Sequence, residues 1–415
     1  MQLHIWGIDT ESSPFKVYAA ELFEAYRQCR RSKRNKASAL AFELDYEEKL
    51  YELCELLESG NWNPSPSLAF VVRRPVLREI FAADFRDRVV HHWLMNKLNP
   101  LLENYFTEDS FACRPYRGTH YGIARMYQYM HSGPEGQYIS RLHVLKLDIS
   151  GFFMNIDRSI LFNGISVWLS TYYRGEDLPL VVEVLSKIIF NDAASNCIRH
   201  GRYKDWNRLP RHKSLFHSPK DCGLPIGNLT SQIMANFYLH PLDVFVRGWL
   251  GIACYGRYVD DFVLMHEDPK VLVEARERIR DFLASKLNLQ LHPHKMYLQH
   301  SGHGLSFLGV MIMPGRVYAG RRIKSNFYQT IQRFNLKLKT GRPDAAGLRA
   351  FSQSVNSYLG LLKHYQTSRL RRSFLMKKLS GNWLNYFSIS GGYAKVVPLI
   401  RPAPQGWPHN RPNRR

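Results

Sequence analysis

The stretch that decides the fold is RYVDDFVL, residues 257–264. It places two adjacent acids, Asp260 and Asp261, between two apolar halves with the composition of β-strands. We therefore expect strands over about 252–255 and 262–265, joined by a tight turn. Adjacent carboxylates repel each other, so a hairpin tip ordinarily avoids them. A hard cation such as Mg²⁺, bound by carboxylate oxygens, would offset this cost. An ordinary hairpin turn is the alternative.

A third acid, Asp148, ends another apolar run further upstream, in LKLDISGFF (145–153). Residues 142–147 are expected to form the strand that delivers it. Two strands that bring carboxylates to one edge could bind two metal ions roughly 4 Å apart, as in-line phosphoryl transfer requires. Taken singly, Asp148 could be a helix N-cap, but the three acids together favour a two-metal site.

The composition indicates the kind of partner. The 415 residues include 57 Lys and Arg against 35 Asp and Glu, a net charge of +22, which favours nucleic acid over the other anionic partner, a membrane surface. No apolar run approaches the length of a membrane span, and the start lacks the layout of a signal peptide. Six scattered cysteines without a Cys-x-x-Cys pair argue against zinc ribbons and disulfides. We expect a cytoplasmic protein of two or three subdomains.

Periodicity and turn residues predict the remaining elements. Strands are expected over 68–72 and 305–312, and a long basic loop over 192–221. Helices are expected over 14–36, 38–58, 89–104, 161–190, 228–239, 271–287, 323–339 and 348–365.

The order of the Asp148 block, a Gly-rich block (223–232) and the YVDD block resembles the palm of reverse transcriptases, over about 65–315. The resemblance implies an α+β, right-hand polymerase fold with fingers, a palm with an antiparallel sheet, and a helical thumb. It implies RNA-directed DNA polymerase activity, with two Mg²⁺ ions (Mn²⁺ being possible) held by Asp148, Asp260, Asp261 and the Ile149 carbonyl. The implied segments are a helical extension (1–64), fingers (65–145 and 165–222), palm (146–164 and 223–317), thumb (318–395) and a basic tail (396–415).

The same resemblance assigns contacts to nucleotide and template. Arg114, in SFACRPYRG (110–118), is the first choice for a triphosphate or template contact, with a structural salt bridge as the alternative. Arg74 and Arg78, from the arginine-rich segment 73–88, are weaker candidates of this kind. Tyr258 and Gly227 complete the expected contacts.

Two further residues have implied roles. Phe153 lies where the family places an aromatic steric gate against the ribose 2′-hydroxyl, with core packing as the alternative. Lys295 resembles the lysine that donates a proton to pyrophosphate. His292 and His294 beside it could suggest a metal, but two histidines without a third ligand are more often surface residues.

The Gly-rich block, GLPIGNLTSQ, indicates which kind of reverse transcriptase this is. Most of the family have Gln where this chain has Ile226, and Pro where it has Gln232. An apolar side chain cannot hydrogen-bond the incoming nucleotide and the template, so discrimination at insertion should weaken. IGNLTSQ resembles the enzymes of diversity-generating retroelements, which copy a template RNA into cDNA with errors at adenines. The implied partners are template RNA, nascent cDNA, dNTPs and a small basic accessory protein that forms a ring, with no membrane.

Other classes are weighed against this one. The Asn-Ala-x-x-His and Val-Thr-Gly elements of retron enzymes are missing, and a group II intron enzyme should continue into a maturase domain. A defence-associated bacterial reverse transcriptase remains the runner-up. A non-catalytic RNA-binding protein on a polymerase fold would explain the charge, but it would not need a costly cluster of three acids.

Overall fold

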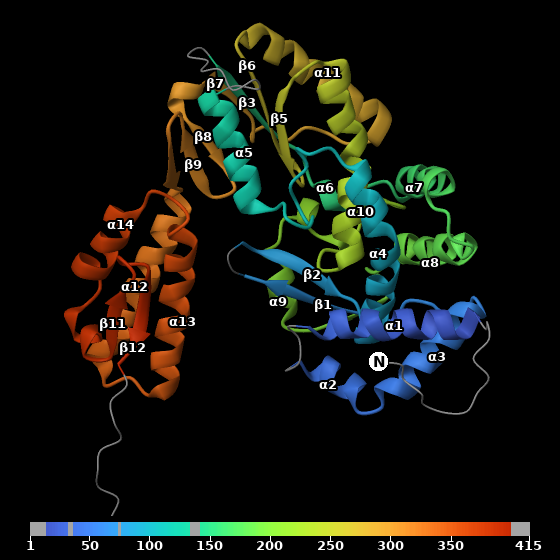
Figure 1. Ribbon diagram of the computed structural model, residues 1–415, viewed down its shortest axis with the longest axis horizontal. Coiled ribbons are helices and arrows are strands. Elements are labelled where there is room, and N and C mark those ends of the chain that lie inside the picture. Colours follow the sequence, from blue (N-terminus) through green and yellow to red (C-terminus); the bar gives the residue numbers. More distant parts are fainter. Residues whose placement is uncertain (1–13, 32–35, 74–75, 133–141, 400–415) are drawn as a thin grey trace, which may run out of the picture. The chain divides into compact units, whose positions relative to one another are not determined.

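The computed structural model describes residues 14–31, 36–73, 76–132 and 142–399, with side chains from Tyr18 onward (Figure 1). The chain divides into two compact units, 1–125 with 142–299, and 126–141 with 300–415. Both units combine helices with mainly antiparallel sheets, so the expected α+β class is confirmed. Among the described residues, no helix is both long and apolar enough to cross a membrane.

The first unit is organised around a four-stranded sheet with strand order β5-β6-β3-β7. Its strands are β5 (Cys254–Tyr258), β6 (Asp261–His266), β3 (His143–Asp148) and β7 (Tyr297–His300). β6 pairs antiparallel with both β3 and β5, in a register that sets Asp261 opposite Asp148 on one side and Tyr258 on the other. The predicted strands on either side of the YVDD turn are confirmed.

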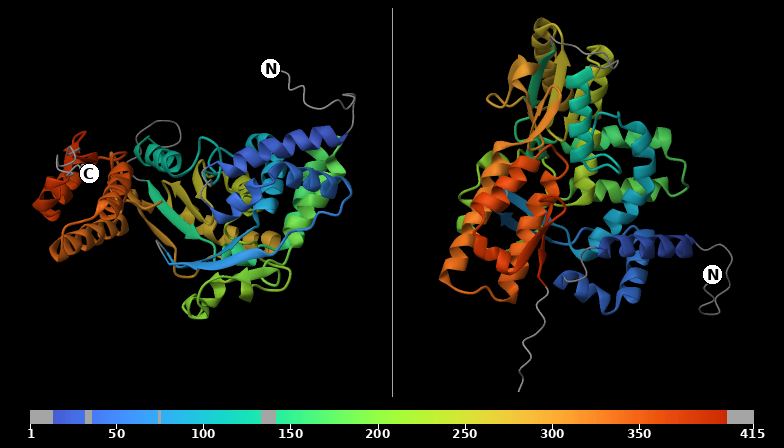
Figure 2. Two further views of the ribbon diagram at one scale, coloured as in Figure 1. Left: turned by 90° about the horizontal axis from the view of Figure 1, so that it is seen from below. Right: turned by 60° about the vertical axis from the view of Figure 1, so that its left-hand side comes forward.

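The same unit also contains helices. They include α1 (Pro14–Arg30), α2 (Ala37–Glu43), α3 (Tyr46–Glu58), α4 (Phe85–Tyr105), α6 (Phe152–Asn155), α7 (Arg158–Tyr172), α8 (Leu178–Phe190), α9 (Tyr203–Trp206), α10 (Leu229–Val244) and α11 (Pro269–Leu287). α5 (Thr119–Ser132) runs across the boundary between the two units. α11 packs along β6, and the N-terminal helix α1 packs along α4 (Figure 2).

Helix boundaries follow local capping chemistry. The Asp268 side chain accepts a hydrogen bond from the Lys270 amide, with Pro269 in the first turn, so α11 begins two residues before the predicted start. Asp84 caps α4 in the same way, through the amide of Arg86. The predicted helix over 161–190 is two helices, α7 and α8, separated at Tyr173–Asp177.

A three-stranded sheet in the same unit has the order β2-β1-β4, from β1 (Ser67–Val72), β2 (Arg78–Ala82) and β4 (Cys197–Arg199). β1 and β2 are antiparallel, whereas β4 is parallel to β1. The predicted loop 192–221 therefore contains β4 and α9, followed by two short 3₁₀ turns at Arg211–Lys213 and Leu215–His217.

The second unit contains a three-stranded sheet and a helical layer. Its elements are β8 (Leu305–Phe307), β9 (Val310–Met313), β10 (Arg316–Ala319), α12 (Arg321–Thr340), α13 (Ala345–Leu362), α14 (Ser368–Ser373), β11 (Phe387–Ser390) and β12 (Lys395–Pro398). The strand predicted over 305–312 is broken because Leu308 and Gly309 both have positive φ. The two basic helices are found, but the β11–β12 hairpin was not predicted.

Candidate active site

The three acids singled out in the sequence meet at one edge of the four-stranded sheet. Asp148 ends β3, Asp261 begins β6, and the two are paired in register. Asp260 lies in the turn before β6, and its carbonyl accepts a hydrogen bond of 3.2 Å from the Ile149 amide. The residues expected to hold metal ions are therefore neighbours in space.

The carboxylates are held in an electrostatically unfavourable arrangement. Burial, and then the charge of Asp148, raise the pKa of Asp260 to about 6. Burial also raises the pKa of Asp261, although the ammonium group of Lys146 opposes the shift. A carboxyl group whose charged form is disfavoured by burial and by like charges is typical of a site that binds a cation.

The donor set fits a divalent ion. Asp261 Oδ1 is buried and has no hydrogen-bond partner among the described residues, whereas its Oδ2 lies 3.0 Å from Lys146 Nζ. Asp148 Oδ1 accepts a hydrogen bond of 2.8 Å from Lys295 Nζ. Over the described ranges, no three or more His, Cys, Asp and Glu side chains are already grouped closely enough to hold a metal ion by themselves. Two lysines thus supply the compensating positive charge at these carboxylates, and carboxylate oxygens are the ligands that Mg²⁺ takes.

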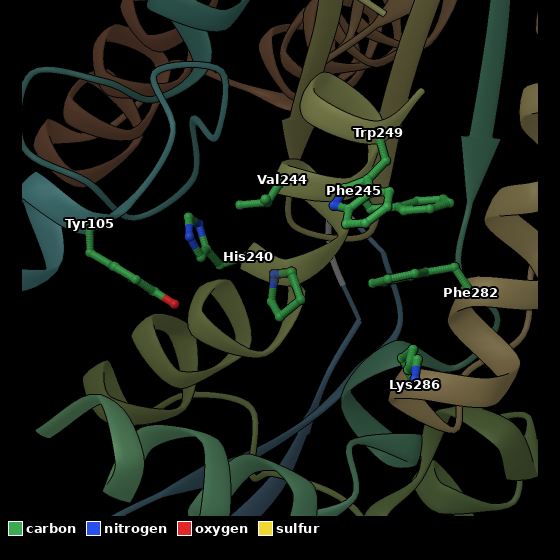
Figure 3. Close-up of a pocket in the computed structure, with 8 residues that line it drawn as sticks. Tyr105, His240, Val244, Phe245, Trp249, Phe282 and Lys286 are labelled. Carbon is green, nitrogen blue, oxygen red and sulfur yellow. The ribbon is translucent and has the colours of Figure 1, made fainter. Parts of the chain in front are cut away.

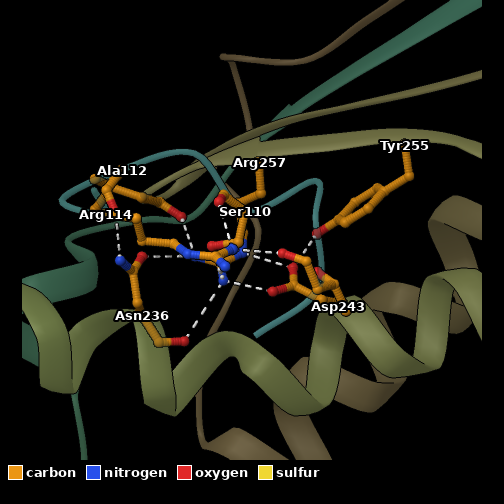
Figure 4. A network of polar contacts seen from close by, with 9 residues as sticks. Ser110, Ala112, Arg114, Asn236, Asp243, Tyr255 and Arg257 are labelled. Carbon is orange, nitrogen blue, oxygen red and sulfur yellow. Dashed lines mark hydrogen bonds and ion pairs between the residues drawn. The ribbon is translucent and has the colours of Figure 1, made fainter. Parts of the chain in front are cut away.

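Behind the turn lies a buried polar network centred on Arg257 (Figure 4). The guanidinium donates two hydrogen bonds of 2.6 Å to Asp243 on α10, and both side chains are fully buried. Asp243 also accepts a hydrogen bond of 2.6 Å from the Tyr255 hydroxyl. Arg257 Nη2 donates to Ser110 Oγ at 3.1 Å. This network ties the catalytic strand to α10 and to the loop before α5.

The network also supports the strained residue of the turn. Val259 has φ +60, a conformation that is unfavourable for a β-branched side chain. Arg257 Nη1 donates a hydrogen bond of 3.1 Å to the Val259 carbonyl. Since strained conformations persist only where their surroundings hold them, Arg257 is a positioning residue for the turn that presents Asp260.

The Gly-rich block packs against strand β2. The Ile226 carbonyl accepts a hydrogen bond of 2.8 Å from the Phe81 amide, and its half-buried side chain packs against an apolar cluster that includes Phe81 and Met154. Gly227 has φ +126, and a Cβ there would lie 2.8 Å from Ile80 Cγ2. No other residue fits this position without strain.

Phe153 is half-buried and packs against the same apolar cluster as Ile226. Phe152 beside it is buried in the main core, and the two rings meet edge to face with centroids 5.4 Å apart. The predicted gate residue and the residue that replaces the usual Gln are thus supported by one set of apolar side chains.

Gln232, on the first turn of α10, is exposed, and its Oε1 accepts a hydrogen bond of 3.1 Å from Cys113 Sγ. Tyr258 is half-buried at the end of β5. The structure therefore connects the Gly-rich block to the SFACRPYRG loop through the residue that stands where the family usually has Pro.

The arginine candidates have different environments. Arg114 is buried and pairs with Glu103 at 3.0 Å, and it also donates to the carbonyls of Thr107 and Ser110. Its structural alternative is therefore the one observed, and we do not include Arg114 in the proposed nucleotide site. Arg78 is exposed on β2. Arg74 lies outside the described residues.

Lys295 has its ammonium group beside Asp148, and its side chain is half exposed. His292 and His294 lie next to it with ring centroids 6.4 Å apart, and no third metal ligand accompanies them among the described residues. Lys295 therefore lies at the carboxylate edge, and its role toward pyrophosphate stays a prediction, whereas the two histidines have the surroundings of surface residues.

Sequence reasoning missed Lys146 and the Arg257–Asp243 pair. Lys146 precedes Asp148 by two strand positions, so strand alternation places both on one face, and this signal could have found it. Nothing in the spacing of Arg257 and Asp243 indicates that they meet, because a π-helical turn (Phe245–Trp249) and a loop intervene.

A separate cavity of about 510 Å³ lies between α4, α10 and α11 (Figure 3). It is mainly apolar, and its lining includes Tyr105, His240, Phe245, Trp249 and Phe282. None of the residues expected to hold nucleotide, template or metal belongs to it, so the carboxylate edge and this cavity are distinct features.

Comparison with known proteins agrees with this geometry. Protein YkfC of Escherichia coli (strain K12) is 23% identical over 68% of this chain and 76% of its own length. Group II intron-encoded protein LtrA of Lactococcus lactis is 23% identical over 65% of this chain, and the match spans half of LtrA.

Solved structures with detectable similarity include telomerases. Telomerase from Candida albicans, in complex with a fragment of telomeric RNA, aligns with 11% identity and a TM-score of 0.43, over 80% of this chain and 63% of that chain. Apo telomerase from Candida tropicalis aligns with 13% identity and a TM-score of 0.45, over 78% and 61%.

The family comparison covers more than half of the chain. Residues 76–312 match the family described as Reverse transcriptase (RNA-dependent DNA polymerase), a range that contains the whole carboxylate edge, the Gly-rich block and strands β2 to β8. The chain therefore belongs to the reverse transcriptase (RNA-dependent DNA polymerase) family.

Proposed function

We propose that this chain copies a template RNA into cDNA with errors at template adenines, as reverse transcriptases of diversity-generating retroelements do. The observation that carries the proposal is Ile226, an apolar residue where most of the family have Gln, packed beside the predicted gate residue Phe153. A site with an apolar side chain there lacks one polar check on the incoming nucleotide. We assign the names fingers, palm and thumb to the segments given above.

In this proposal Asp148, Asp260, Asp261 and the Ile149 carbonyl hold two Mg²⁺ ions. Such ions, when bound, lower the pKa of the primer 3′-hydroxyl and hold the triphosphate and the leaving pyrophosphate. Lys295, 2.8 Å from Asp148, donates a proton to the pyrophosphate. Phe153 excludes the ribose 2′-hydroxyl. Arg78 contacts phosphate, and Tyr258, Gly227 and Gln232 lie against the nascent base pair.

The catalytic part of the proposal is tested by replacing Asp260 and Asp261 together with Asn. Primer extension on an RNA template should fall by at least about 10³-fold, because the charges that the reaction uses are removed. RNA binding, measured by filter retention, should change less than twofold. The matched control is Glu274→Gln with Asp281→Asn, which removes two exposed charges from α11. Full activity in the first variant would exclude the assignment.

The error-prone part is tested by Ile226→Gln. A restored hydrogen bond should lower misincorporation opposite template adenine about tenfold, measured by sequencing the cDNA. Ile226→Leu keeps the site apolar and should leave the error spectrum unchanged. If Ile226→Gln behaves like Ile226→Leu, Ile226 does not explain the errors.

The second candidate is a reverse transcriptase of another bacterial element or of a defence system, and similarity to a group II intron-encoded protein favours it. It predicts that the wild-type enzyme makes no excess of errors opposite adenine. The third is a non-catalytic RNA-binding protein, which predicts no extension with any primer, template and Mg²⁺. The retroelement proposal also implies a small basic accessory protein, testable by co-purification with the neighbouring gene product.

A further inference from the structure

Three consecutive cationic side chains, Arg211, His212 and Lys213, form an exposed 3₁₀ turn in the segment that follows β4. None of the three has an ion-pair partner among the residues that the structure describes. A run of cations on a surface is ordinarily just solvated, so its position in the fold has to decide whether it has a role.

The turn lies next to the end of the catalytic strand. The His212 carbonyl lies 3.0 Å from the place that a Cβ on Gly151 would occupy, and Gly151 follows Asp148 by three residues. Gly151 has φ +53, so its lack of a side chain lets the two backbones approach. The carbonyl of Asp148 itself accepts a hydrogen bond of 2.7 Å from the His292 amide.

A further cation lies at the same carboxylate. The ammonium group of Lys295 donates a hydrogen bond of 2.8 Å to Asp148 Oδ1, and the Lys295 side chain is half exposed. The Arg211–Lys213 turn and Lys295 are therefore exposed cations close to Asp148. Exposed cations beside catalytic carboxylates are positioned to neutralise an anionic ligand that enters there.

A buried carboxylate fixes the turn in place. Glu79 on β2 is 1% exposed, and its Oε2 accepts a hydrogen bond of 2.6 Å from the Leu215 amide. Its Oε1 accepts from Ser214 Oγ at 3.0 Å and from Trp206 Nε1 at 2.7 Å. Burial raises the pKa of Glu79, so the fold gives up some stability to keep this acid there. These three hydrogen bonds come from residues on both sides of the Arg211–Lys213 turn, so they leave the turn little freedom.

Aromatic packing reinforces the same attachment. The Phe216 ring packs at a tilt against Phe81 of β2 with ring centroids 5.4 Å apart, and the guanidinium of Arg199 lies 3.8 Å from the Phe216 ring centroid. A segment held by a buried acid, two rings and a cation is a rigid part of the site rather than a mobile loop.

We propose that Arg211, His212 and Lys213 form a phosphate-binding element beside Asp148, and that Glu79 is the residue that positions it. The ligand is a phosphate group, carried either by the incoming dNTP or by the nucleic acid strand. The inference rests on the proposed polymerase activity, and it adds to that activity a binding element outside the three acids and the arginine-rich segment.

The test compares two pairs of exposed cations in one segment. Arg211→Gln with Lys213→Gln removes two charges from the turn, and Lys204→Gln with Arg208→Gln removes two charges from the neighbouring α9 region. The first pair should raise KM for dNTP about tenfold if the ligand is the triphosphate. If the ligand is the strand, it should instead weaken binding of primer–template and lower the slope of log Kd against log salt by about 2.

The control pair should leave KM, Kd and the salt slope within twofold of the wild-type values. Equal behaviour of the two pairs in every measurement would overturn the inference. If the wild-type protein extends no primer, the proposed function fails, while the binding measurements still decide whether the turn contacts phosphate.

The positioning role of Glu79 is tested by Glu79→Gln, alone and combined with the Arg211 and Lys213 changes. A residue that acts through the turn should raise KM or Kd by itself with kcat less affected, and should add little once the two cations are gone. Additive effects, or an unchanged KM and Kd in a folded Glu79→Gln protein, would show that Glu79 has no such role. If Glu79→Gln does not fold, the cation pairs still test the phosphate element.

Discussion

Two groups of charged side chains, one fully buried and one partly exposed, lie on opposite sides of one turn, and the fold treats them differently. Behind the turn, the Arg257 guanidinium is matched by Asp243, Ser110 and the Val259 carbonyl. On the other side of the turn, Asp148, Asp260 and Asp261 repel one another, and Asp261 Oδ1 has no hydrogen-bond partner in the part of the chain that the structure describes. The charge of Arg257, which supports the site, is thus fully paired. The charges of the three acids, which are expected to bind the metal ions, are not.

The difference has a physical reason. A buried charge that is fully hydrogen-bonded fixes one conformation, so it can hold the strained Val259 in place. A cluster of like charges does the opposite, because it raises the free energy of the empty site and makes a cation favourable. The Arg257 network therefore provides rigidity, and the three acids provide affinity for an incoming ion.

The largest expected effect comes from breaking the satisfied side. Arg257→Met should lower the free energy of unfolding by about 3–5 kcal/mol, because the Asp243 carboxylate stays buried and, of the described side chains, only the Tyr255 hydroxyl still donates to it. Urea denaturation followed by circular dichroism measures this.

The control for this experiment is the double replacement Arg257→Met with Asp243→Leu. Removing both charges should recover much of the lost stability, because no isolated charge remains buried. Polymerase activity should stay low in the double variant, since the Val259 carbonyl still lacks its donor. A loss below about 1 kcal/mol in the single variant would contradict the view that this pair supports the fold.

The opposite sign is expected on the unsatisfied side. The pKa of Asp260 is raised in the folded protein, so folding binds a proton between the ordinary pKa of an aspartate and about 6, and stability falls as pH rises through this window. In metal-free buffer Asp260→Asn should therefore be more stable than wild type at pH 7.5, by on the order of 2 kcal/mol, with the gain disappearing below about pH 4.

The same experiment includes its own control. Mg²⁺ should stabilise the wild-type protein more than Asp260→Asn, because the ion binds the folded carboxylates and the variant has one fewer. Thermal unfolding across pH 4–8, with and without Mg²⁺, separates the two effects. A variant less stable than wild type at pH 7.5 would mean that Asp260 is compensated by contacts other than those described.

The sequence was sufficient to find the three acids, but not the Arg257 network that supports them. Asp148 ends one apolar strand, and Asp260 and Asp261 stand between two others, so local pattern alone predicted that the three acids meet at one sheet edge. Arg114, in contrast, was expected to contact nucleotide, and it pairs with Glu103 on α4. Its exposure depends on how α4 packs on the neighbouring loop, and no local signal in the sequence gives that packing.

The same limit applies to the other misses. Glu79 accepts hydrogen bonds from residues well over a hundred positions later, and the side chain of Asp243 points to Arg257 only once α10 has packed beneath β5. Helix and strand boundaries were predictable where helix caps and strand alternation are local signals. The break between two strands at Leu308 and the break between two helices at Tyr173–Asp177 were not predictable in this way. Polar networks between distant segments are set by tertiary packing, and only a structure shows them.

The smallest expected effect concerns Lys146, which partly compensates the charge of one of the three acids. Its ammonium group contacts Asp261 Oδ2 at 3.0 Å and opposes the rise in the pKa of Asp261 that burial causes, so it supplies part of the missing positive charge. Both side chains are partly exposed, and the pair should contribute about 1 kcal/mol or less. Lys146→Met should lower stability by this amount at neutral pH in metal-free buffer. It should also increase the stabilisation that Mg²⁺ produces, because the ion no longer competes with an ammonium group for Asp261.

Lys146→Arg keeps the charge and should respond to Mg²⁺ as wild type does, which thermal unfolding at a series of Mg²⁺ concentrations can measure. If Lys146→Met and Lys146→Arg gain equally from Mg²⁺, the lysine does not share the acid with the ion, and the excess negative charge at the front of the turn is larger than the Lys146 contact suggests.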